Sequence, residues 1–407
     1  MRKHEIVAPA GSPEKLAYAV AYGADAVYLG GNNFGLRAAA ANFDRDAMTR
    51  AVQFARRHNV KVYVTLNIFA RNQDIEALPR YVHFLDQIGV DAVIVSDPGV
   101  MSLVRATAPG MKIHVSTQAN TTNWRSARVW ESLGAERVVL ARELSLEEIR
   151  GIGEQSAVEL EVFVHGAMCV SYSGRCLLSG YMAGRDANLG DCAQSCRWKY
   201  QLVEEKRPGE YFPVCEDDGG TYILSSRDLC LLEYLPALVQ AGVTAFKIEG
   251  RVKSAHYAAT VTRVYRLALD AYLADPAGYR VQPEWLAEIG KVSNRHYTTG
   301  FINGTGFLNS PPPLESIYRR RYTFVGAVLD YDPHRRLLQV EQRNRFARGE
   351  QLEILSPGMQ TQPLDVAQIL DGEGRSLDAA PHPRQVVYLP WSHPLPAFSL
   401  LRRADKV

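Results

Sequence analysis

Several features that mark common protein classes are missing from this sequence of 407 residues. No stretch approaches 18 uncharged apolar residues, so we expect no membrane-spanning segment. The N-terminal residues lack the apolar run of a secretory signal, and we therefore expect a cytosolic protein. The net charge is only +2. It neither demands nor excludes a nucleic-acid partner, because the distribution of charge matters more than its total.

The short motifs of nucleotide-binding and hydrolytic enzymes are missing as well. The first predicted turn, Ala8-Pro9-Ala10-Gly11-Ser12, is not a dinucleotide-binding fingerprint, and there is no Walker-type phosphate loop. There is also no Gly-x-Ser-x-Gly nucleophile elbow and no His-Glu-x-x-His helix. These absences argue against the enzyme classes that depend on such motifs.

Cysteine is scarce, but its placement is informative. The six cysteines all lie within residues 169–230: Cys169, Cys176, Cys192, Cys196, Cys215 and Cys230. Disulfides are a poor explanation in a reducing cytosol. Clustered cytosolic cysteines more often indicate a metal site or redox chemistry.

Most of the chain alternates short apolar runs with helical patterns. The runs at residues 5–8, 26–29, 60–66, 92–96, 112–116, 137–140, 159–164 and 245–248 are typical of buried parallel strands. Ser12 followed by Pro13 is a good helix start, since serine caps the helix and proline fits its first turn. Eight such units predict an α/β fold, a (β/α)8 TIM-like barrel over residues 1–285. The alternative is an open doubly wound sheet, which would have fewer strands.

One connection of the predicted barrel is abnormally long. About 80 residues separate the seventh strand from the eighth, and they contain every cysteine. Such an insertion is usually functional. It would leave the barrel from the C-terminal end of a strand, which is the face that carries active sites. We therefore predict a Cys-rich insertion, residues 165–235, at the active-site mouth.

The last quarter of the chain has a different texture. Residues 286–317 include three consecutive prolines and are expected to form a linker. Short strand patterns follow at residues 322–329, 337–342, 350–354, 366–370 and 385–389. They predict a small all-β barrel over residues 318–407.

Cysteine spacing alone leaves three interpretations open. Structural zinc usually takes ligands in closely spaced pairs, and only Cys192 and Cys196 have such a spacing. An iron–sulfur cluster accepts four thiolates from separate loops, and the glycines of this segment would let the backbone bend around it. Inert buried thiols are the third interpretation.

A longer pattern surrounds the first two cysteines. The run from Glu161 to Ser179 includes Phe163, His165, Gly166, Cys169, Gly174 and Cys176. It resembles the signature of the peptidase U32 family at every fixed position. Further similar segments are Ala8-Pro9-Ala10-Gly11, Asp25-Ala26-Val27-Tyr28-Leu29-Gly30 and Lys247-Ile248-Glu249-Gly250-Arg251. Together with the C-terminal domain, the resemblance covers essentially the whole chain.

The resemblance implies an activity despite the family's name, which records a collagenase-like peptidase. Better-understood members are similar to oxygen-independent hydroxylases with a 4Fe–4S cluster. They act on a wobble uridine of tRNA, on ribosomal RNA or on the ubiquinone ring. With one compact β-domain after the barrel, this chain most resembles the branch that forms 5-hydroxyuridine at tRNA position 34 with prephenate. The family's ligand pattern falls on Cys169, Cys176, Cys192 and Cys230, and Cys196 could replace Cys192.

Charged residues at strand ends are the candidate catalytic groups. Lys247 and Glu249 end the eighth predicted strand, and His165 lies at the exit of the seventh. Such residues usually face the mouth of a barrel, where a histidine can bind a carboxylate or transfer a proton. The competing interpretations are a buried structural histidine and an ion pair of Glu249 with Lys247 or Arg251.

Binding of a small dianionic co-substrate such as prephenate would need cations and polar groups. Bidentate arginine suits carboxylates, which makes Arg175, Arg197 and Arg251 candidates. Asn67 and Gln118, near the ends of the third and fifth strands, could also face the ligand, although cap or turn roles explain them equally well.

An arginine-rich segment begins the C-terminal domain. Residues 318–350 contain eight arginines and four acidic residues. Arginine with interleaved aromatics suits phosphate contacts and base stacking. We therefore predict RNA contacts, with tRNA as the partner, from Arg319, Arg320, Arg321, Arg343 and Arg345. The alternative is that these arginines belong to an ordinary solvated surface of the β-domain and have no role in binding.

Two rival functions remain at this point. A cysteine peptidase would need one thiolate beside a histidine, and His165 is close to Cys169 in sequence. Several crowded thiols favour metal capture over one free nucleophile. The other rival is a non-catalytic RNA-binding module with a structural cluster. The resemblance also admits a homologous partner subunit, and Cys215 is expected to be a loop thiol.

Overall fold

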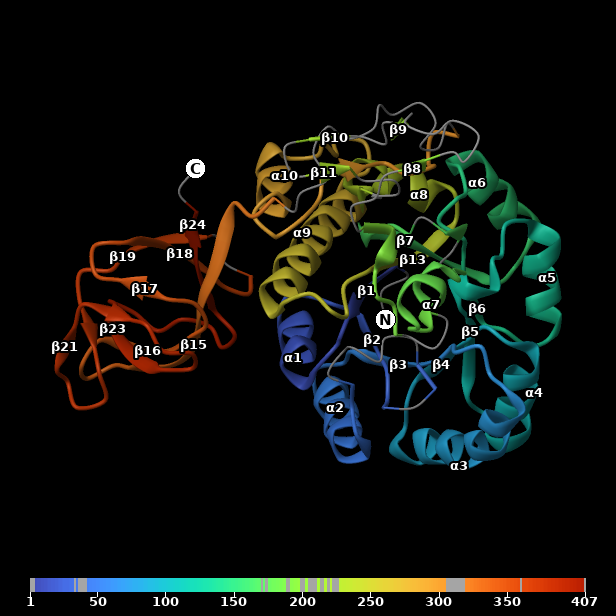
Figure 1. Cartoon of the computed structure of the whole chain (residues 1–407), viewed down its shortest axis with the longest axis horizontal. Coiled ribbons are helices and arrows are strands. Elements are labelled where there is room, and N and C mark those ends of the chain that lie inside the picture. The colour runs from blue at the N-terminus through green and yellow to red at the C-terminus, as the bar shows by residue number, and fades with distance from the viewer. Residues whose placement is uncertain are drawn as a thin grey trace.

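The chain forms a barrel surrounded by helices, with a separate C-terminal sheet beside it (Figure 1). A computed structural model describes residues 4–32, 34–35, 42–169, 171–172, 175–187, 191–197, 202–203, 211–212, 216–217, 220–221, 227–304, 319–358 and 361–405. The sheet domain lies against the side of the barrel where α1 (Pro13–Ala21) and α9 (Ala255–Ala274) are found.

Eight parallel strands close the barrel. They are β1 (Glu5–Pro9), β2 (Ala26–Leu29), β3 (Lys61–Leu66), β4 (Ala92–Val95), β5 (Lys112–Val115), β6 (Arg137–Val139), β7 (Glu159–Ala167) and β13 (Val243–Ile248). Each strand pairs with the next, and β13 pairs with both β7 and β1. All eight predicted strands are confirmed, and closure through β13 excludes the open doubly wound sheet.

Helices cover the outside of this barrel. Besides α1 and α9 they are α2 (Arg45–Arg57), α3 (Asn72–Ile88), α4 (Pro98–Thr107), α5 (Trp124–Ser132), α6 (Leu146–Gln155) and α8 (Leu235–Gln240). Local sequence starts them: the Ser12 side chain accepts the Lys15 N–H, and Ser145 forms a capping box with Glu148. Apolar side chains between strands and helices form the largest core. None of the helices in the described residues is long and apolar enough to cross a membrane.

The Cys-rich insertion occupies the predicted place between β7 and β13. Its described part contains α7 (Leu178–Ala183), a 3-10 turn (Ser195–Arg197) and the short strands β8 (Leu202–Val203), β9 (Tyr211–Phe212), β10 (Glu216–Asp217) and β11 (Gly220–Thr221). It ends in β12 (Asp228–Cys230), which pairs antiparallel with the end of β7 and sets Cys230 opposite His165. Cys215 lies outside the described residues.

The described part of the expected linker is attached to the barrel. Residues 286–304 include the end of α10 (Pro283–Ile289) and β14 (Tyr297–Thr298), and β14 pairs parallel with β12. The run of three prolines lies within residues 305–318, outside the described part of the chain.

The C-terminal domain is a curled antiparallel sheet, as expected for a small all-β domain. Its order is β19-β18-β24-β15-β16-β23-β20-β21. The strands are β15 (Tyr322–Asp332), β16 (Leu337–Gln342), β18 (Gln351–Leu355), β19 (Gln362–Asp365), β20 (Ile369–Leu370), β21 (Ser376–Leu377), β23 (Val386–Pro390) and β24 (Leu400–Ala404), and β17 (Phe346–Ala347) pairs separately with β22 (Ala379–Ala380).

Two details of this domain correct the sequence-based prediction. The strand predicted at residues 366–370 is interrupted, since β19 ends at Asp365 and β20 begins at Ile369. The central strand β24 was not predicted, because Arg402 and Arg403 break its apolar pattern. Yet Arg402 is fully buried, so its charge is satisfied by tertiary contacts that the local pattern does not contain.

Arg402 belongs to the contact between the two domains. Its guanidinium donates to both carboxylate oxygens of Glu288 in α10, at 2.7 and 2.8 Å, and to Glu353 Oε2 at 2.9 Å. Nearby, the hydroxyl of Tyr22, the residue that follows α1, donates to the Leu355 carbonyl at 2.8 Å. Buried ion pairs of this kind tie the sheet to the barrel across a distance in sequence of more than a hundred residues.

A matched pair of variants tests this contact. Arg402→Ala should lower the free energy of unfolding by about 3–5 kcal/mol, because it removes the fully buried cation that Glu288 and Glu353 share and leaves these carboxylates with the more exposed Lys291. Arg403→Ala, which removes a more exposed pair with Glu350, should cost about 0–1 kcal/mol. Urea denaturation measures both. Equal losses of unfolding free energy would show that the buried Arg402 contacts stabilise the protein no more than the exposed Arg403 pair does.

Candidate functional site

The C-terminal end of the barrel carries a cavity of about 800 Å³. Strand ends form its floor and walls, and the insertion forms its outer side. Many of the residues predicted from the sequence line it together: Asn67, Gln118, Cys169, Cys176, Cys192, Lys247, Glu249, Arg251 and Arg320. Side chains from β3, the β5 end, the insertion and the β13 end thus converge on one space, as a barrel active site requires.

The charge of this lining is strongly one-sided. Its cations are Arg142, Lys247, Arg251, Lys253 and Arg320, and its carboxylate is Glu249. Polar groups supplement them: the Asn67 amide donates to Ser116 Oγ at 3.2 Å. Among the described residues, the buried Gln118 Oε1 has no hydrogen-bond partner and leaves an acceptor for a ligand. Such a site suits a small anion that also carries hydrogen-bonding groups.

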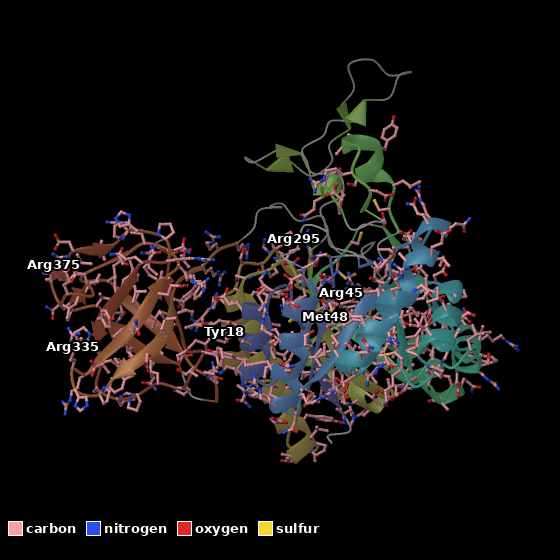
Figure 2. All side chains as sticks on the ribbon, turned by 90° about the horizontal axis from the view of Figure 1, so that it is seen from below. Tyr18, Arg45, Met48, Arg295, Arg335 and Arg375 are labelled. Atoms are coloured by element: carbon pink, nitrogen blue, oxygen red, sulfur yellow. The ribbon has the colours of Figure 1, made fainter. Side chains whose placement is uncertain are left out.

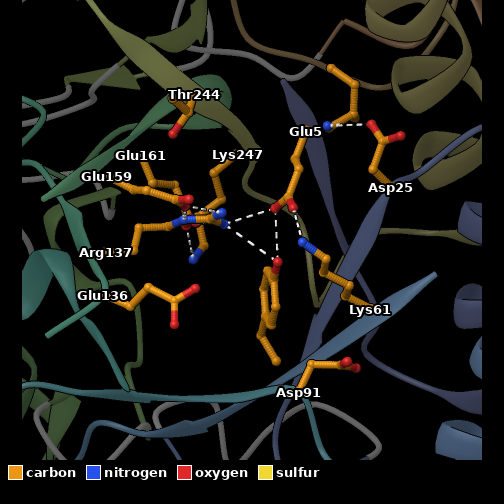
Figure 3. Close-up of polar contacts among 12 residues, drawn as sticks. Glu5, Asp25, Lys61, Asp91, Glu136, Arg137, Glu159, Glu161, Thr244 and Lys247 are labelled. Carbon is orange, nitrogen blue, oxygen red and sulfur yellow. Dashed lines mark hydrogen bonds and ion pairs between the residues drawn. The ribbon is translucent and has the colours of Figure 1, made fainter. Parts of the chain in front are cut away.

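Lys247 lies at the floor of the cavity and is held from below. Its ammonium is 2.6 Å from Glu161 Oε1, and both side chains are almost completely buried. Glu161 also lies 3.3 Å from Arg137, which in turn contacts Glu5 at 2.9 Å (Figure 3). Burial lowers the pKa of Lys247, and the negative charge of Glu161 raises it. Because burial is the larger effect, the pKa stays below its ordinary value. The ammonium partner is therefore Glu161, not Glu249.

Arg251 enters the cavity between two glycines of the N-terminal motifs. A Cβ at Gly11 would lie 1.8 Å from the Arg251 carbonyl oxygen, and one at Gly30 would lie 2.4 Å from its guanidinium. The guanidinium points at Thr65 Oγ1, 3.4 Å away, and the residue is 4% exposed. Both glycines are thus explained by the close approach of this arginine.

Arg142 is a site residue that the sequence reasoning missed. It donates to the Ala167 carbonyl at 3.2 Å, lies 3.5 Å from Glu249 Oε2 and stacks on the Phe163 ring at 3.9 Å. It therefore joins the end of β7 to the loop after β13. A signal was present, because Arg142 follows the sixth predicted strand closely, and strand ends were the criterion applied to Lys247.

Four cysteines share the insertion side of the cavity: Cys169, Cys176, Cys192 and Cys196. The Leu178 N–H donates to Cys176 Sγ and the Gln194 N–H to Cys192 Sγ, each at 3.3 Å. Backbone donors to sulfur are a feature of iron–sulfur sites. Within the described residues, no three Cys, His, Asp or Glu side chains are close enough together to hold a metal ion.

Cys230 and His165 face another region, behind β7. The Tyr265 hydroxyl lies 3.4 Å from His165 Nδ1 and 3.9 Å from Cys230 Sγ. Neither residue lines the cavity. Burial lowers the pKa of His165 to about 3, so the ring is neutral. His165 is thus buried, as one of the two interpretations from the sequence expects, but its Nε2 has no hydrogen-bond partner among the described residues.

A bulge explains why His165 turns away. Strict alternation along β7 would place Glu161, Phe163 and His165 on one face. Opposite β13, however, Phe163 pairs with Lys247 and His165 with Ile248, so one residue of β7 is extra. Such a bulge shifts the following side chain to the other face. Sequence alternation cannot reveal it.

The remaining predicted residues are dispersed. Arg175 donates twice to the Gln118 carbonyl, at 3.1 and 2.9 Å, and so braces the wall of the cavity. The Arg197 side chain lies outside the described part of the structure. Among the predicted RNA-binding residues, Arg319, Arg321 and Arg345 are exposed, and Arg320 reaches the cavity. Arg343 instead pairs with Glu14 and Glu341 and helps to join the domains.

The buried network predicts a pH-dependent stability defect. Glu161→Gln should lower the free energy of unfolding by about 3–5 kcal/mol at pH 7, because it leaves Lys247 and Arg137 with less compensation. Glu159→Gln, whose carboxylate is half exposed, should cost about 0–1 kcal/mol.

The sign of the pH effect follows from Lys247. Its folded pKa lies below the ordinary 10.5, so between the two values the unfolded chain binds more protons and stability rises with pH. Glu161→Gln removes a negative charge beside Lys247 and so lowers the folded pKa of Lys247 further. Its deficit should therefore shrink as pH rises from 7 toward 10 in urea denaturation. A deficit independent of pH would contradict the assignment of Lys247 as the partner of Glu161.

Comparisons with known proteins place the chain in one family. Residues 11–309 match the family model "Peptidase family U32", and residues 320–402 match the "Peptidase family U32 C-terminal domain". A Bacillus subtilis relative named "tRNA hydroxylation protein P1" is 43% identical over 386 residues, which cover 95% of this chain and 91% of the relative.

Two Escherichia coli relatives extend this comparison. The "tRNA hydroxylation protein P" is 35% identical over 434 aligned positions, covering 96% of this chain and 94% of the relative. A protein named as a 23S rRNA 5-hydroxycytidine synthase is 37% identical over 306 residues, covering 74% of this chain and 45% of the relative. The extent of these matches establishes that the chain belongs to the peptidase U32 family.

Proposed function

We propose that this protein hydroxylates RNA, and that its substrate is tRNA. Two relatives aligned over more than nine-tenths of this chain carry names that refer to tRNA hydroxylation. The observation that carries the proposal is the cavity itself, because thiols of the insertion and cations of the strand ends line the same space. An RNA base entering it would meet both.

The finer proposal is formation of 5-hydroxyuridine at wobble position 34 with prephenate as co-substrate. Prephenate is a dianion, and the lining offers Arg251 and Lys247 at the floor and Lys253 near the loop after β13. Arginine can hold one carboxylate in bidentate fashion, and a buried ammonium can hold the other. The acceptor at Gln118 Oε1 would suit a hydroxyl group of the ligand.

Access of the base also fits the geometry. Chemistry on a base requires it to leave its stack, and an unpaired loop nucleotide does so at the least cost. The cavity volume of about 800 Å³ lies within the range of small-molecule sites and leaves room for a base beside a small acid. Glu249, held by Arg142 at 3.5 Å, is the carboxylate placed to orient the base or accept a proton.

We further propose that the cysteines hold a 4Fe–4S cluster. Three of the four donors fit, since Cys169, Cys176 and Cys192 line one wall of the cavity and two of them receive backbone N–H donors. The family pattern puts the fourth ligand on Cys230, which pairs with His165 of β7, faces Tyr265 and does not line the cavity. Cys196, which also lines the cavity, is the competing fourth ligand. A bound cluster would supply one-electron chemistry to the site.

The peptidase suggested by the family name is disfavoured by the same geometry. A cysteine nucleophile needs a histidine within hydrogen-bond reach to take its proton. In the described residues no histidine lines the cavity. His165, the nearest in sequence, packs against Tyr265 behind β7 instead.

An activity assay tests the main proposal. Pure protein, tRNA and prephenate, kept free of oxygen, should yield 5-hydroxyuridine at position 34, detected by nucleoside mass spectrometry. Arg251→Ala should lower kcat/KM for prephenate about tenfold or more, the loss expected for a charge-assisted contact. Arg375→Ala, an exposed arginine of the sheet domain, should leave it unchanged.

The outcomes separate the alternatives. RNA binding without product would favour the non-catalytic RNA-binding module. Cleavage of a denatured protein by the pure enzyme, with an unchanged nucleoside profile, would favour the peptidase.

Metal analysis tests the cluster. Protein purified without oxygen should contain about four iron and four sulfide per chain. Cys169→Ala, Cys176→Ala, Cys192→Ala and Cys230→Ala should each lose the iron and the brown colour, and Cys196→Ala should keep both. Iron lost in Cys196→Ala and kept in Cys230→Ala would assign the fourth ligand to Cys196. Stoichiometric zinc in place of iron would refute the cluster.

A further inference from the structure

The exposed aromatic side chains lie on segments that also contribute residues to the cavity. Among the large hydrophobic side chains that are exposed in the described residues, the aromatic ones are Phe69 at 37%, Tyr172 at 51% and Tyr181 at 88%. None of the three lines the cavity itself, but each lies within three residues of one that does, namely Asn67, Cys169 and Ser179. The exposed aliphatic side chains are more widely spread: Leu177, Met182 and Val252 lie on the same segments or line the cavity, whereas Val129 lies on α5 and Leu329 in β15. The placement of all three exposed aromatic side chains on these segments calls for a physical reason.

Each aromatic side chain is placed by an element that also lines the cavity. Phe69 follows β3, and the Arg175 guanidinium lies 6.0 Å from its ring centroid. Arg175 itself is fixed to the carbonyl of Gln118, a lining residue. On the insertion, Leu178 and Ser179 of α7 face the cavity, and the same short helix exposes Tyr181.

The insertion stands out from the barrel at this end. Figure 1 shows α7 within the ring of helices, over the barrel, and Figure 2 shows the insertion projecting beyond the barrel in a perpendicular view. Tyr172 lies on the same segment, between Cys169 and Cys176. Tyr172 and Tyr181 therefore belong to the segment whose cysteines line the cavity.

Exposed aromatic groups at such a density indicate a contact surface, because water solvates them poorly. Their chemistry suits unpaired nucleotides, since every base has a face that can stack on an aromatic ring without sequence preference. Arg175 beside Phe69, together with the cationic excess of the lining, would meet the phosphates. Burial raises the pKa of Tyr172, and the negative charges of the nearby Glu143 and Glu148 raise it further. Acidic groups therefore lie on the Tyr172 side. The phosphates would therefore run on the Phe69 side.

We propose that Phe69, Tyr172 and Tyr181 form a stacking rim that holds the unpaired RNA nucleotides flanking the one in the cavity. The proposal rests on RNA as the substrate and assigns recognition of the loop to the barrel. The exposed arginines of the sheet domain would contact phosphates elsewhere on the RNA. Stacking would keep the loop open, so that the reacting base can enter the cavity.

Affinity for an anticodon stem–loop RNA tests the rim. Phe69→Ala and Tyr181→Ala should each weaken binding by the full chain about fivefold or more, the effect of losing one stacked base. Tyr181→Phe keeps the ring face and should bind like the wild type. Val129→Ser, an exposed aliphatic position on α5, should also change nothing. Unaltered thermal unfolding of all four variants would confirm that the fold is intact.

Salt dependence distinguishes stacking from charge. The rim variants should keep the slope of log affinity against log salt, because no phosphate contact is removed. The triple charge reversal of Arg319, Arg320 and Arg321 should flatten it. A rim variant that flattens the slope, or that binds the loop as tightly as the wild type, would overturn the rim.

Two further results separate the rim from its rivals. Loop binding that depends on the rim, without any hydroxylated product, would support the rim and refute the proposed function. Product formation with unchanged loop affinity in Tyr181→Ala would support the proposed function and refute the rim. Concentration-dependent self-association that is lost in Tyr181→Ala, with RNA affinity unchanged, would show that a second copy of the chain occupies this surface and would overturn the proposal.

Discussion

The contact between Lys247 and Glu161 organises the centre of this molecule. A buried ammonium is tolerated only with a charged partner, and Glu161 provides it from the neighbouring strand at 2.6 Å. Glu161 is itself compensated by Arg137, whose other partners include Glu5 of β1. Below the network the barrel interior is closed by side chains, and above it the cavity begins. The position of the cavity floor therefore follows from electrostatics within the barrel.

The upper part of the site follows from close approaches that only glycine permits. Arg251 reaches the cavity because Gly11 and Gly30 leave room for its backbone and guanidinium. The glycine-containing motifs of β1 and β2 and the motif at the end of β13 are thus parts of one arrangement. With Arg142 bracing Glu249 from β6, four regions of the chain present a cationic space to the cysteines of the insertion.

Prediction from the sequence succeeded where a local pattern carries the information. Apolar runs located all eight barrel strands within a few residues, and the cysteines marked the insertion. It failed at β24, where the buried Arg402 interrupts the pattern, and at residues 366–370, where the strand is broken. Arg142 was missed although it meets the strand-end criterion. Phe69 and Tyr181 gave no signal, because exposure of an aromatic side chain cannot be read from its neighbours in sequence.

The sequence by itself determined the order of strands and helices, the place of the insertion and the crowding of thiols and strand-end cations, since these depend on spacing along the chain. Only the tertiary structure decided which charges pair and which way side chains point. Lys247 meets Glu161 from 86 positions away, and a bulge in β7 turns His165 from the cavity toward Tyr265. Pairing and direction depend on strand register, and register is set by packing of the whole barrel.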